Sequence, residues 1–305
     1  MVAYNVYGGS GIDRLVERRT DTAWFTGVLQ DEATRFLVGW EHRLPVVDSA
    51  EGPRVATVSA SALRDIDLRA PVLLGTLDGA VHVVVDAAGL SESDAATLLP
   101  PSARFADLRE VGSLLAASEA GLAAAARSLL LWHDAQRHCG RCGAPTAPAE
   151  AGHTLVCSEA ACGATHHPRI EPAAITLVTD GEDRVLLGHS HRALKGGYSC
   201  FAGFVEAGES LEEAAAREVY EEVGVDLAEL RFHSSQPWPF PSQLMVGFIA
   251  RAASFEHRAD QMEILDARWF DRDELLACPD DDTLRLPRVD SISRRMIEDW
   301  MHRRA

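Results

Sequence analysis

The chain has 305 residues, 47% of them hydrophobic, and a formal net charge of −17 at pH 7. This length exceeds one ordinary domain and supplies enough apolar side chains for more than one buried core. The negative charge argues against broad nucleic-acid binding, which depends on neutralising many phosphates with basic residues.

The first part, residues 1–133, is predicted to form an α/β domain without a catalytic constellation. A hairpin is expected at Asp78-Gly79, because this dipeptide favours the tight turns that join antiparallel strands. The charged segment 13–21 is interpreted as a solvated surface. Strand-like runs cover 35–40, 54–59, 72–77 and 81–86, and helical patterns cover 91–99 and 113–133.

The longest apolar stretch, 114–132, contains Glu119 and Arg127. It is therefore predicted to be a soluble helix rather than a membrane span, and no membrane partner is expected. Residues 1–30 lack a basic start followed by an apolar segment, so no secretory signal is predicted. The expected compartment is a reducing cytoplasm.

Four of the six cysteines cluster in the second part, residues 134–168, as Cys139-x2-Cys142 and Cys157-x4-Cys162. Four thiolates at this spacing can close a tetrahedral Zn²⁺ site with no position open for catalysis, which predicts one structural zinc in a ribbon. Two disulfides are the alternative, but a reducing compartment favours the metal.

The third part, residues 169–305, is predicted to contain strands at 173–179, 185–188, 199–204, 230–234 and 245–252 and a final helix over 291–303. A further helix is expected between the third and fourth strands. Ser210 and Glu213 have the spacing of a capping box at its start, and Gly224 is a suitable C-cap.

This helix carries three glutamates, Glu218, Glu221 and Glu222, whose spacing of three and four residues places them on one face. Clustered like charges destabilise a helix unless a cation offsets them, and carboxylate oxygens suit Mg²⁺ or Mn²⁺. A solvated acidic helix is the alternative interpretation. It accounts for the charge but not for the spacing of the flanking glycines and Arg217.

The segment from Gly203 to Val225 resembles the Nudix box, with no departure from its pattern. The matching positions are Gly203, Glu209, Arg217, Glu218, Val219, Glu221, Glu222, Gly224 and Val225. The resemblance implies an α+β fold with an α/β/α sandwich and a hydrolase that cleaves a nucleoside diphosphate linked to another group. It also implies that the three helix glutamates hold catalytic Mg²⁺ or Mn²⁺. Arg217 is expected to orient them, and Glu209 to pair with Arg217 or hold a metal-bound water.

Downstream, the run 234–244 alternates three prolines with Trp238 and Phe240. Prolines disfavour a central strand or a helix, so a stiff loop that displays both aromatic side chains is predicted. The run from Ser235 to Pro241 resembles the signature of NADH pyrophosphatases within the Nudix family. That resemblance implies cleavage of NADH or NAD⁺ to a nicotinamide mononucleotide and AMP, and removal of NAD caps from RNA 5′ ends.

The resemblance also implies further residue roles. Glu263 is expected to join the metal site. Phe204 is expected to stack on a substrate base, with core packing as its alternative, and the remaining substrate contacts are assigned to Gln236, Trp238 and Ser293. The first part corresponds to a domain associated with dimerisation, so a homodimer is expected. Two other functions stay open: a Nudix hydrolase of ADP-ribose or a nucleotide sugar, and an inactive Nudix and zinc-ribbon binding protein.

Overall fold

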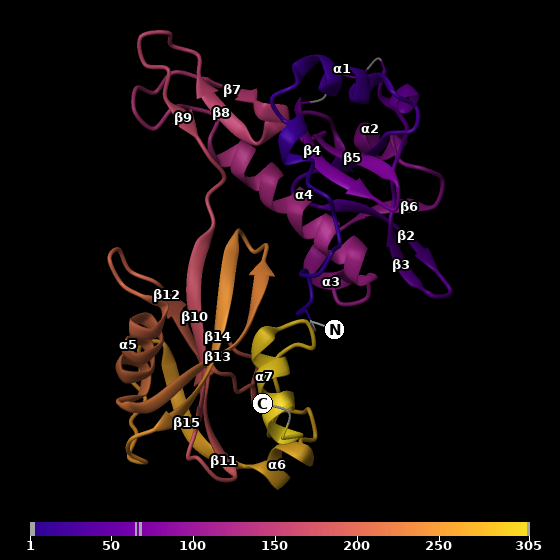
Figure 1. The fold of residues 1–305 in the computed structure, drawn as a ribbon. Coiled ribbons are helices and arrows are strands. Elements are labelled where there is room, and N and C mark those ends of the chain that lie inside the picture. Colours follow the sequence, from indigo (N-terminus) through magenta and orange to yellow (C-terminus); the bar gives the residue numbers. More distant parts are fainter. Residues whose placement is uncertain (1–3, 65, 67–68, 304–305) are drawn as a thin grey trace. The chain divides into compact units, whose positions relative to one another are not determined.

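A computed structural model describes residues 4–64, 66 and 69–303, which fall into two compact units (Figure 1). The N-terminal unit comprises Tyr7–Arg169 together with Pro239–Ser242. The C-terminal unit comprises residues 4–6, Ile170–Trp238 and the chain from Gln243 onward. Each unit therefore includes a short segment that is distant in sequence from the rest of it.

The C-terminal unit is built on a mixed sheet whose six described strands follow the order β13-β14-β10-β11-β15, with β12 also paired to β10. The β10 and β14 strands are parallel, and the other pairs are antiparallel. The bounds are β10 Glu171–Thr179, β11 Arg184–Ser190, β12 Phe201–Phe204, β13 Leu227–Trp238, β14 Gln243–Ala252 and β15 Ile264–Asp271.

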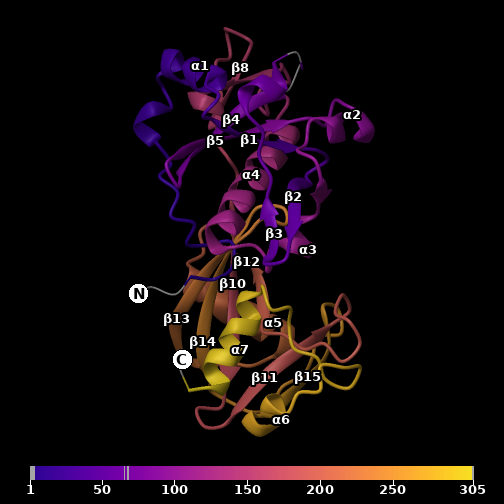
Figure 2. The same ribbon diagram turned by 90° about the vertical axis from the view of Figure 1, so that its right-hand side faces the viewer.

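Two helices cover opposite faces of this sheet, α5 (Leu211–Val223) on one and α7 (Ile292–Met301) on the other (Figures 1 and 2). Val219 and Val223 of α5 pack in one buried cluster, and Met296 and Ile297 of α7 pack in another. A short helix, α6 (Arg272–Leu276), follows β15. Burial of one apolar face of each helix against the sheet produces the expected α/β/α sandwich.

The proline-aromatic run is more regular than predicted. Strand β13 continues through Pro237 to Trp238, and β14 begins at Gln243, so the loop is limited to residues 239–242. Pro237 is accommodated because β13 is an edge strand of the sheet, where a missing N–H donor is tolerated.

Phe240 is not displayed, which corrects the expectation for this side chain. It is 7% exposed and belongs to the N-terminal unit, where the Arg109 guanidinium lies 4.0 Å from its ring centroid and that of Arg127 5.0 Å. Tyr7 contacts the same ring edge-on at 5.8 Å. These partners are distant in sequence, so the local pattern could not indicate them.

Before the cysteine-rich segment, the described residues of the N-terminal unit form two three-stranded sheets, β1-β5-β4 and β3-β2-β6, and the long helix α4 packs against the first of them. The predicted hairpin is confirmed, since Leu77 pairs with Ala80 across Asp78 and Gly79, which both have positive φ. The strands are β1 Arg35–Gly39, β2 Leu44–Ser49, β3 Gly52–Val55, β4 Arg69–Leu77, β5 Ala80–Asp86 and β6 Ala103–Ala106. The helices are α1 Thr22–Gln30, α2 Glu92–Thr97, α3 Leu108–Val111 and α4 Ala117–Ala135, with 3-10 turns at Val16–Arg18, Ala60–Leu63 and Glu150–Gly152.

The cysteine-rich segment forms a small antiparallel sheet of β7 (Thr146–Ala149), β8 (Thr154–Cys157) and β9 (Thr165–His166). Within the part of the chain that the structure describes, no helix combines the length and apolar character needed to cross a membrane.

Candidate active site and zinc site

Helix α5 is fixed at both ends by local hydrogen bonds. The Ser210 hydroxyl accepts from the Glu213 N–H at 3.2 Å, and the Glu213 carboxylate accepts from the Ser210 N–H at 2.8 Å, which completes the capping box. Gly224 closes the helix in the left-handed region, at φ 70°, and donates to the Tyr220 carbonyl at 2.7 Å. These caps fix the register that presents the glutamates.

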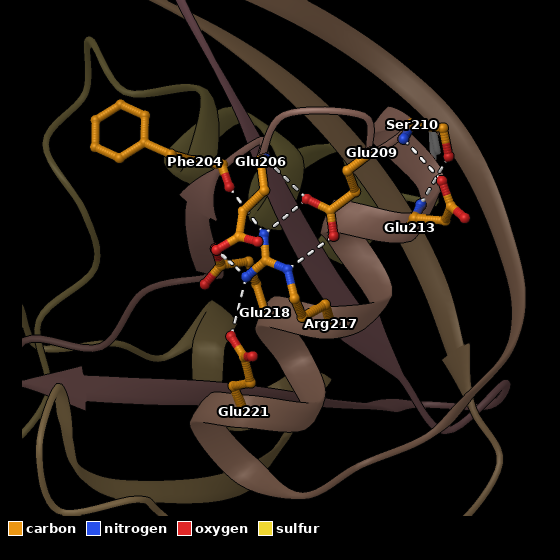
Figure 3. A network of polar contacts seen from close by, with 8 residues as sticks. All are labelled: Phe204, Glu206, Glu209, Ser210, Glu213, Arg217, Glu218 and Glu221. Carbon is orange, nitrogen blue, oxygen red and sulfur yellow. Dashed lines mark hydrogen bonds and ion pairs between the residues drawn. The ribbon is translucent and has the colours of Figure 1, made fainter.

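Arg217 organises the acidic side chains around it (Figure 3). Its guanidinium donates to both carboxylate oxygens of Glu209 at 2.7 and 2.9 Å, to Glu218 at 2.8 Å and to Glu221 at 2.9 Å. It also donates to the Phe204 carbonyl at 2.9 Å, which ties the helix to β12. Glu209 accepts a further bond from the Glu206 N–H, and the bonds to Arg217 hold the Glu209 pKa at about 2.

Strand β12, which contains Gly203, leaves space for the Glu218 side chain. A Cβ atom on Gly203 would lie only 1.9 Å from the Glu218 carboxyl carbon, so any side chain larger than hydrogen would displace this carboxylate. Gly203 therefore permits the close approach of β12 to the acidic face of the helix.

Glu222 differs from its neighbours because it is buried. The side chain is 6% exposed, and its Oε2 atom has no hydrogen-bond partner among the described residues. Burial, followed in order of effect by the neighbouring carboxylates of Glu218, Glu263 and Asp260, raises the Glu222 pKa to about 8. Since all of these neighbours are acidic, a bound cation would stabilise the charged form of this carboxyl group.

The structure brings Glu263, in the loop between β14 and β15, close to Glu218 and Glu222. It precedes β15, and its carboxylate is close enough to raise the pKa of both Glu218 and Glu222. Asp260, which the sequence analysis did not single out, acts on Glu222 in the same direction. Only the fold brings this loop, about forty residues along the chain, beside α5.

These carboxylates fit a hard divalent cation. Glu222, Glu218 and Glu263 would supply the oxygen ligands that Mg²⁺ or Mn²⁺ prefers, and the cation would balance a buried charge that has no partner. Glu221 is at the edge of the group, with its side chain 58% exposed and paired with Arg217. The glutamates do not form as compact a group of potential ligands as the cysteines described below.

A pocket of about 800 Å³ opens beside this acidic group in the C-terminal unit, a volume typical of small-molecule sites. Its lining includes Glu222 and Glu263, and it also includes Tyr198, Arg285 and Arg294. The exposed apolar side chains of Leu194, Met262 and Val289 contribute to the lining as well. The sequence analysis missed Tyr198 and these arginines, which share no motif and are spread over about a hundred residues.

The predicted substrate residues divide into two groups. Phe204 is 50% exposed, so it is not a core residue, and its ring points away from the Arg217 network (Figure 3). Trp238 is half-buried at the end of β13. Neither aromatic side chain lines the pocket.

Gln236 and Ser293 are each 1% exposed, and hydrogen bonds within the C-terminal unit occupy the polar atoms of their side chains. The Gln236 amide donates to the carbonyls of Val6 and Asp290 and accepts from the Ile292 N–H. The Ser293 hydroxyl accepts from the Cys200 N–H at 3.0 Å. In this conformation these bonds help to fix the start of α7.

The four clustered cysteines meet the geometry of a zinc site. Their sulfur atoms all lie within 4.8 Å of one another, with Cys139 and Cys162 3.9 Å apart and Cys142 and Cys157 3.4 Å apart. A tetrahedral Zn²⁺ with Zn–S bonds of about 2.3 Å requires sulfurs about 3.8 Å apart. All four are free thiols, so the disulfide alternative is not supported. The Arg141 N–H helps to lower the Cys139 pKa to about 6, whereas burial raises the Cys157 pKa to about 12. Zinc binding would therefore be coupled to release of protons from the thiols.

Comparison with protein families finds three matches in chain order. Residues 33–132 match the NADH pyrophosphatase-like rudimentary NUDIX domain, and residues 134–166 match the NADH pyrophosphatase zinc ribbon domain. Residues 169–293 match the NUDIX domain. The zinc ribbon match and the sulfur geometry agree on a structural zinc site.

Curated relatives extend the match over most of the chain. The chain is 40% identical over 256 residues to the NAD-capped RNA hydrolase NudC of Mycobacterium bovis, covering 81% of this chain and 80% of that protein. It is 38% identical over 215 residues to the NAD-capped RNA hydrolase NUDT12 of Macaca fascicularis, covering 67% of this chain and 45% of that one. It is 45% identical over 166 residues to the chloroplastic Nudix hydrolase 19 of Arabidopsis thaliana, covering 52% of this chain but only 38% of the plant protein.

Proposed function

Because this chain belongs to the Nudix hydrolase family, in its NADH pyrophosphatase branch, we propose that it hydrolyses the pyrophosphate bond of NADH and NAD⁺. Water is added across the bond, and the products are a nicotinamide mononucleotide and AMP. The same reaction on an NAD-capped RNA releases the nicotinamide mononucleotide and leaves a 5′-monophosphate on the RNA.

The observation that carries this proposal is the buried Glu222 carboxylate at the wall of the pocket. Its unpartnered oxygen, with Glu218 and Glu263 beside it, provides a site for cations where a pyrophosphate can approach. Bound Mg²⁺ or Mn²⁺ would neutralise phosphate charge and activate water. Arg217 holds Glu209, Glu218 and Glu221 in place, so the acidic face is ordered before substrate binds.

Base recognition is assigned to Phe204 and Trp238. The exposed Phe204 is the last residue of β12, and its carbonyl accepts a bond from Arg217, so a base stacked on its ring would lie near the metal site. Stacking tolerates different bases, because each base offers a π-face. Gln236 and Ser293 contribute by holding the neighbouring backbone rather than by direct contact.

The test is a product assay that offers NADH, NAD⁺, NAD-capped RNA and ADP-ribose in parallel, with either Mg²⁺ or Mn²⁺. We expect AMP from NADH and NAD⁺, and 5′-monophosphorylated RNA from the capped RNA. A preference for ADP-ribose or a nucleotide sugar would overturn the NADH assignment and leave only the Nudix chemistry. The Glu222→Gln protein is the matched negative control, because it removes one ligand charge with little change of shape.

We also propose a homodimer, on the basis of the N-terminal domain match, and a location in the cytoplasm, because a reducing compartment suits a site of four free thiols. Light scattering on the purified full chain measures the mass directly. A monomer at micromolar concentration would contradict the dimer without affecting the catalytic proposal.

A further inference from the structure

We propose that Asp260 is a positioning residue that locks Glu263 and Glu222 into one metal-binding arrangement. The inference rests on the proposed function and extends it to a residue outside the Nudix box. It is drawn from the loop between β14 and β15, which carries Glu263 to the acidic group.

The Asp260 carboxylate fixes the backbone on which Glu263 is carried. Its Oδ1 and Oδ2 atoms each accept from the Glu263 N–H at 3.2 Å, and Oδ1 also accepts from the Ile264 N–H at 2.9 Å. Ile264 is the first residue of β15 and is buried. The side chain of Asp260 thereby fixes the backbone of Glu263 where the chain enters β15.

The backbone of Asp260 is attached to the other half of the site. Its N–H donates to the Glu222 carbonyl at 3.0 Å, and the Arg258 N–H donates to the Val223 carbonyl at 2.9 Å. One residue therefore joins the last turn of α5, which carries Glu222, to the start of β15, which follows Glu263. A shift of Asp260 changes the separation of these two carboxylates.

Besides Asp260, backbone bonds hold this loop: the Gln261 N–H donates to the Ile264 carbonyl at 3.0 Å, and the His191 N–H donates to the Glu263 carbonyl at 3.4 Å. Met262 is 81% exposed, and Gln261 has a positive φ of 64°. The Gln261 side chain bonds the Leu265 carbonyl, within the same turn. Since no large apolar side chain of residues 260–263 is buried, loss of the Asp260 carboxylate should loosen the loop without unfolding the sandwich.

The bonds that Asp260 accepts also distinguish it from a metal ligand. Both of its oxygens are already used by backbone N–H groups, whereas an oxygen of Glu222 is free. Its effect on the metal is therefore expected to be indirect, through the placement of Glu263. Removal of a group that holds a metal ligand in place through hydrogen bonds lowers metal affinity or activity by about 10- to 100-fold.

The experiment measures Mn²⁺ binding to the full-length protein by electron paramagnetic resonance, alongside turnover of NADH. For Asp260→Ala we expect the Mn²⁺ dissociation constant to rise about tenfold or more and kcat to fall, with KM for NADH little changed. Asp260→Asn keeps one acceptor oxygen for the Ile264 and Glu263 N–H groups, so it should recover part of the affinity. If Asp260→Asn is as impaired as Asp260→Ala, the carboxylate charge itself matters and the positioning role is wrong.

A double-mutant cycle provides the second readout. In a Glu263→Gln background, Asp260→Ala should change Mn²⁺ affinity by less than about twofold, because the group that Asp260 positions is already lost. Full additivity would overturn the proposal. Asp180→Ala is the matched control, since Asp180 likewise accepts from two backbone N–H groups, in the β10–β11 turn. It should leave Mn²⁺ affinity unchanged, and a similar loss there would indicate a general structural effect. Because Mn²⁺ binding is measured without substrate, failure to cleave NADH would refute the proposed function separately.

Discussion

Replacement of Glu222 by Gln should stabilise the protein while abolishing its activity. In the absence of a divalent cation, the Glu222 pKa is raised to about 8, against about 4.5 for the unperturbed group, so the folded state binds this proton more tightly than the unfolded state. The stability that this tightly bound proton contributes is fully present below pH 4.5, and it is lost progressively as the pH rises to about 8. A Gln side chain at this position has no charge to bury.

The magnitude follows from the same linkage. One proton bound by the folded state alone changes the free energy of unfolding by about 1.4 kcal/mol per pH unit. Between pH 5 and pH 7 the wild type should therefore lose on the order of 3 kcal/mol relative to the Glu222→Gln variant. Divalent cation should restore stability to the wild type by binding the folded state, and should restore less to the variant.

The assay is urea unfolding at pH 5, 6, 7 and 8, followed by tryptophan fluorescence. Divalent cations are removed by dialysis without a chelator, because a chelator would also strip the zinc. For each protein, the free energy of unfolding is plotted against pH. Subtracting the Glu222→Gln profile from the wild-type profile cancels every group that titrates equally in both proteins. Glu212→Gln is the control, since this exposed residue makes the same charge change on the same helix and its profile should parallel the wild type. Parallel profiles for wild type and Glu222→Gln would show that burial does not perturb this carboxyl group.

Three further outcomes are expected. Cys139→Ser should reduce bound zinc from about one per chain, measured by mass spectrometry of the metal, and should lower stability because zinc binding is coupled to folding. Arg217→Lys keeps the charge but loses the fork that contacts three glutamates, so kcat should fall about tenfold or more, while an unchanged kcat would show that these contacts are dispensable. Phe204→Ala should lower kcat/KM for NADH about ten- to a hundredfold by removing about 1–3 kcal/mol of stacking. Phe232→Ala, at another exposed aromatic residue, should not, and equal losses would contradict a specific stacking role.

The features predicted correctly from the sequence depend on residues close together in the chain. The capping box of Ser210 and Glu213, the C-cap at Gly224 and the hairpin at Asp78-Gly79 each need only a few neighbouring positions. The close spacing within each cysteine pair likewise predicts a shared metal site. For such signals, the bonding partners lie within one turn or one loop.

Other features depend on partners that the fold brings from far along the chain. Strand β15 was not predicted, because the segment Ile264–Asp271 mixes buried and charged positions without a clean alternation. Phe240 was expected at the surface, since its ring contacts come from residues 7, 109 and 127. Gln236 was expected to face a ligand, but the carbonyls that it bonds belong to Val6 and Asp290.

The box glutamates look equivalent in sequence, but the structure gives them unequal electrostatic environments. Arg217 is one cation, and its hydrogen bonds are directed to Glu209, Glu218 and Glu221. Glu222 receives none of these bonds and is the most deeply buried of the group. The charge that remains uncompensated is therefore concentrated at the Glu222 carboxylate on the pocket wall. A divalent cation bound there would have the most favourable electrostatic interaction with the acidic group. The arginine keeps the outer glutamates ordered, and the buried glutamate couples the stability of the folded protein to binding of the catalytic cation.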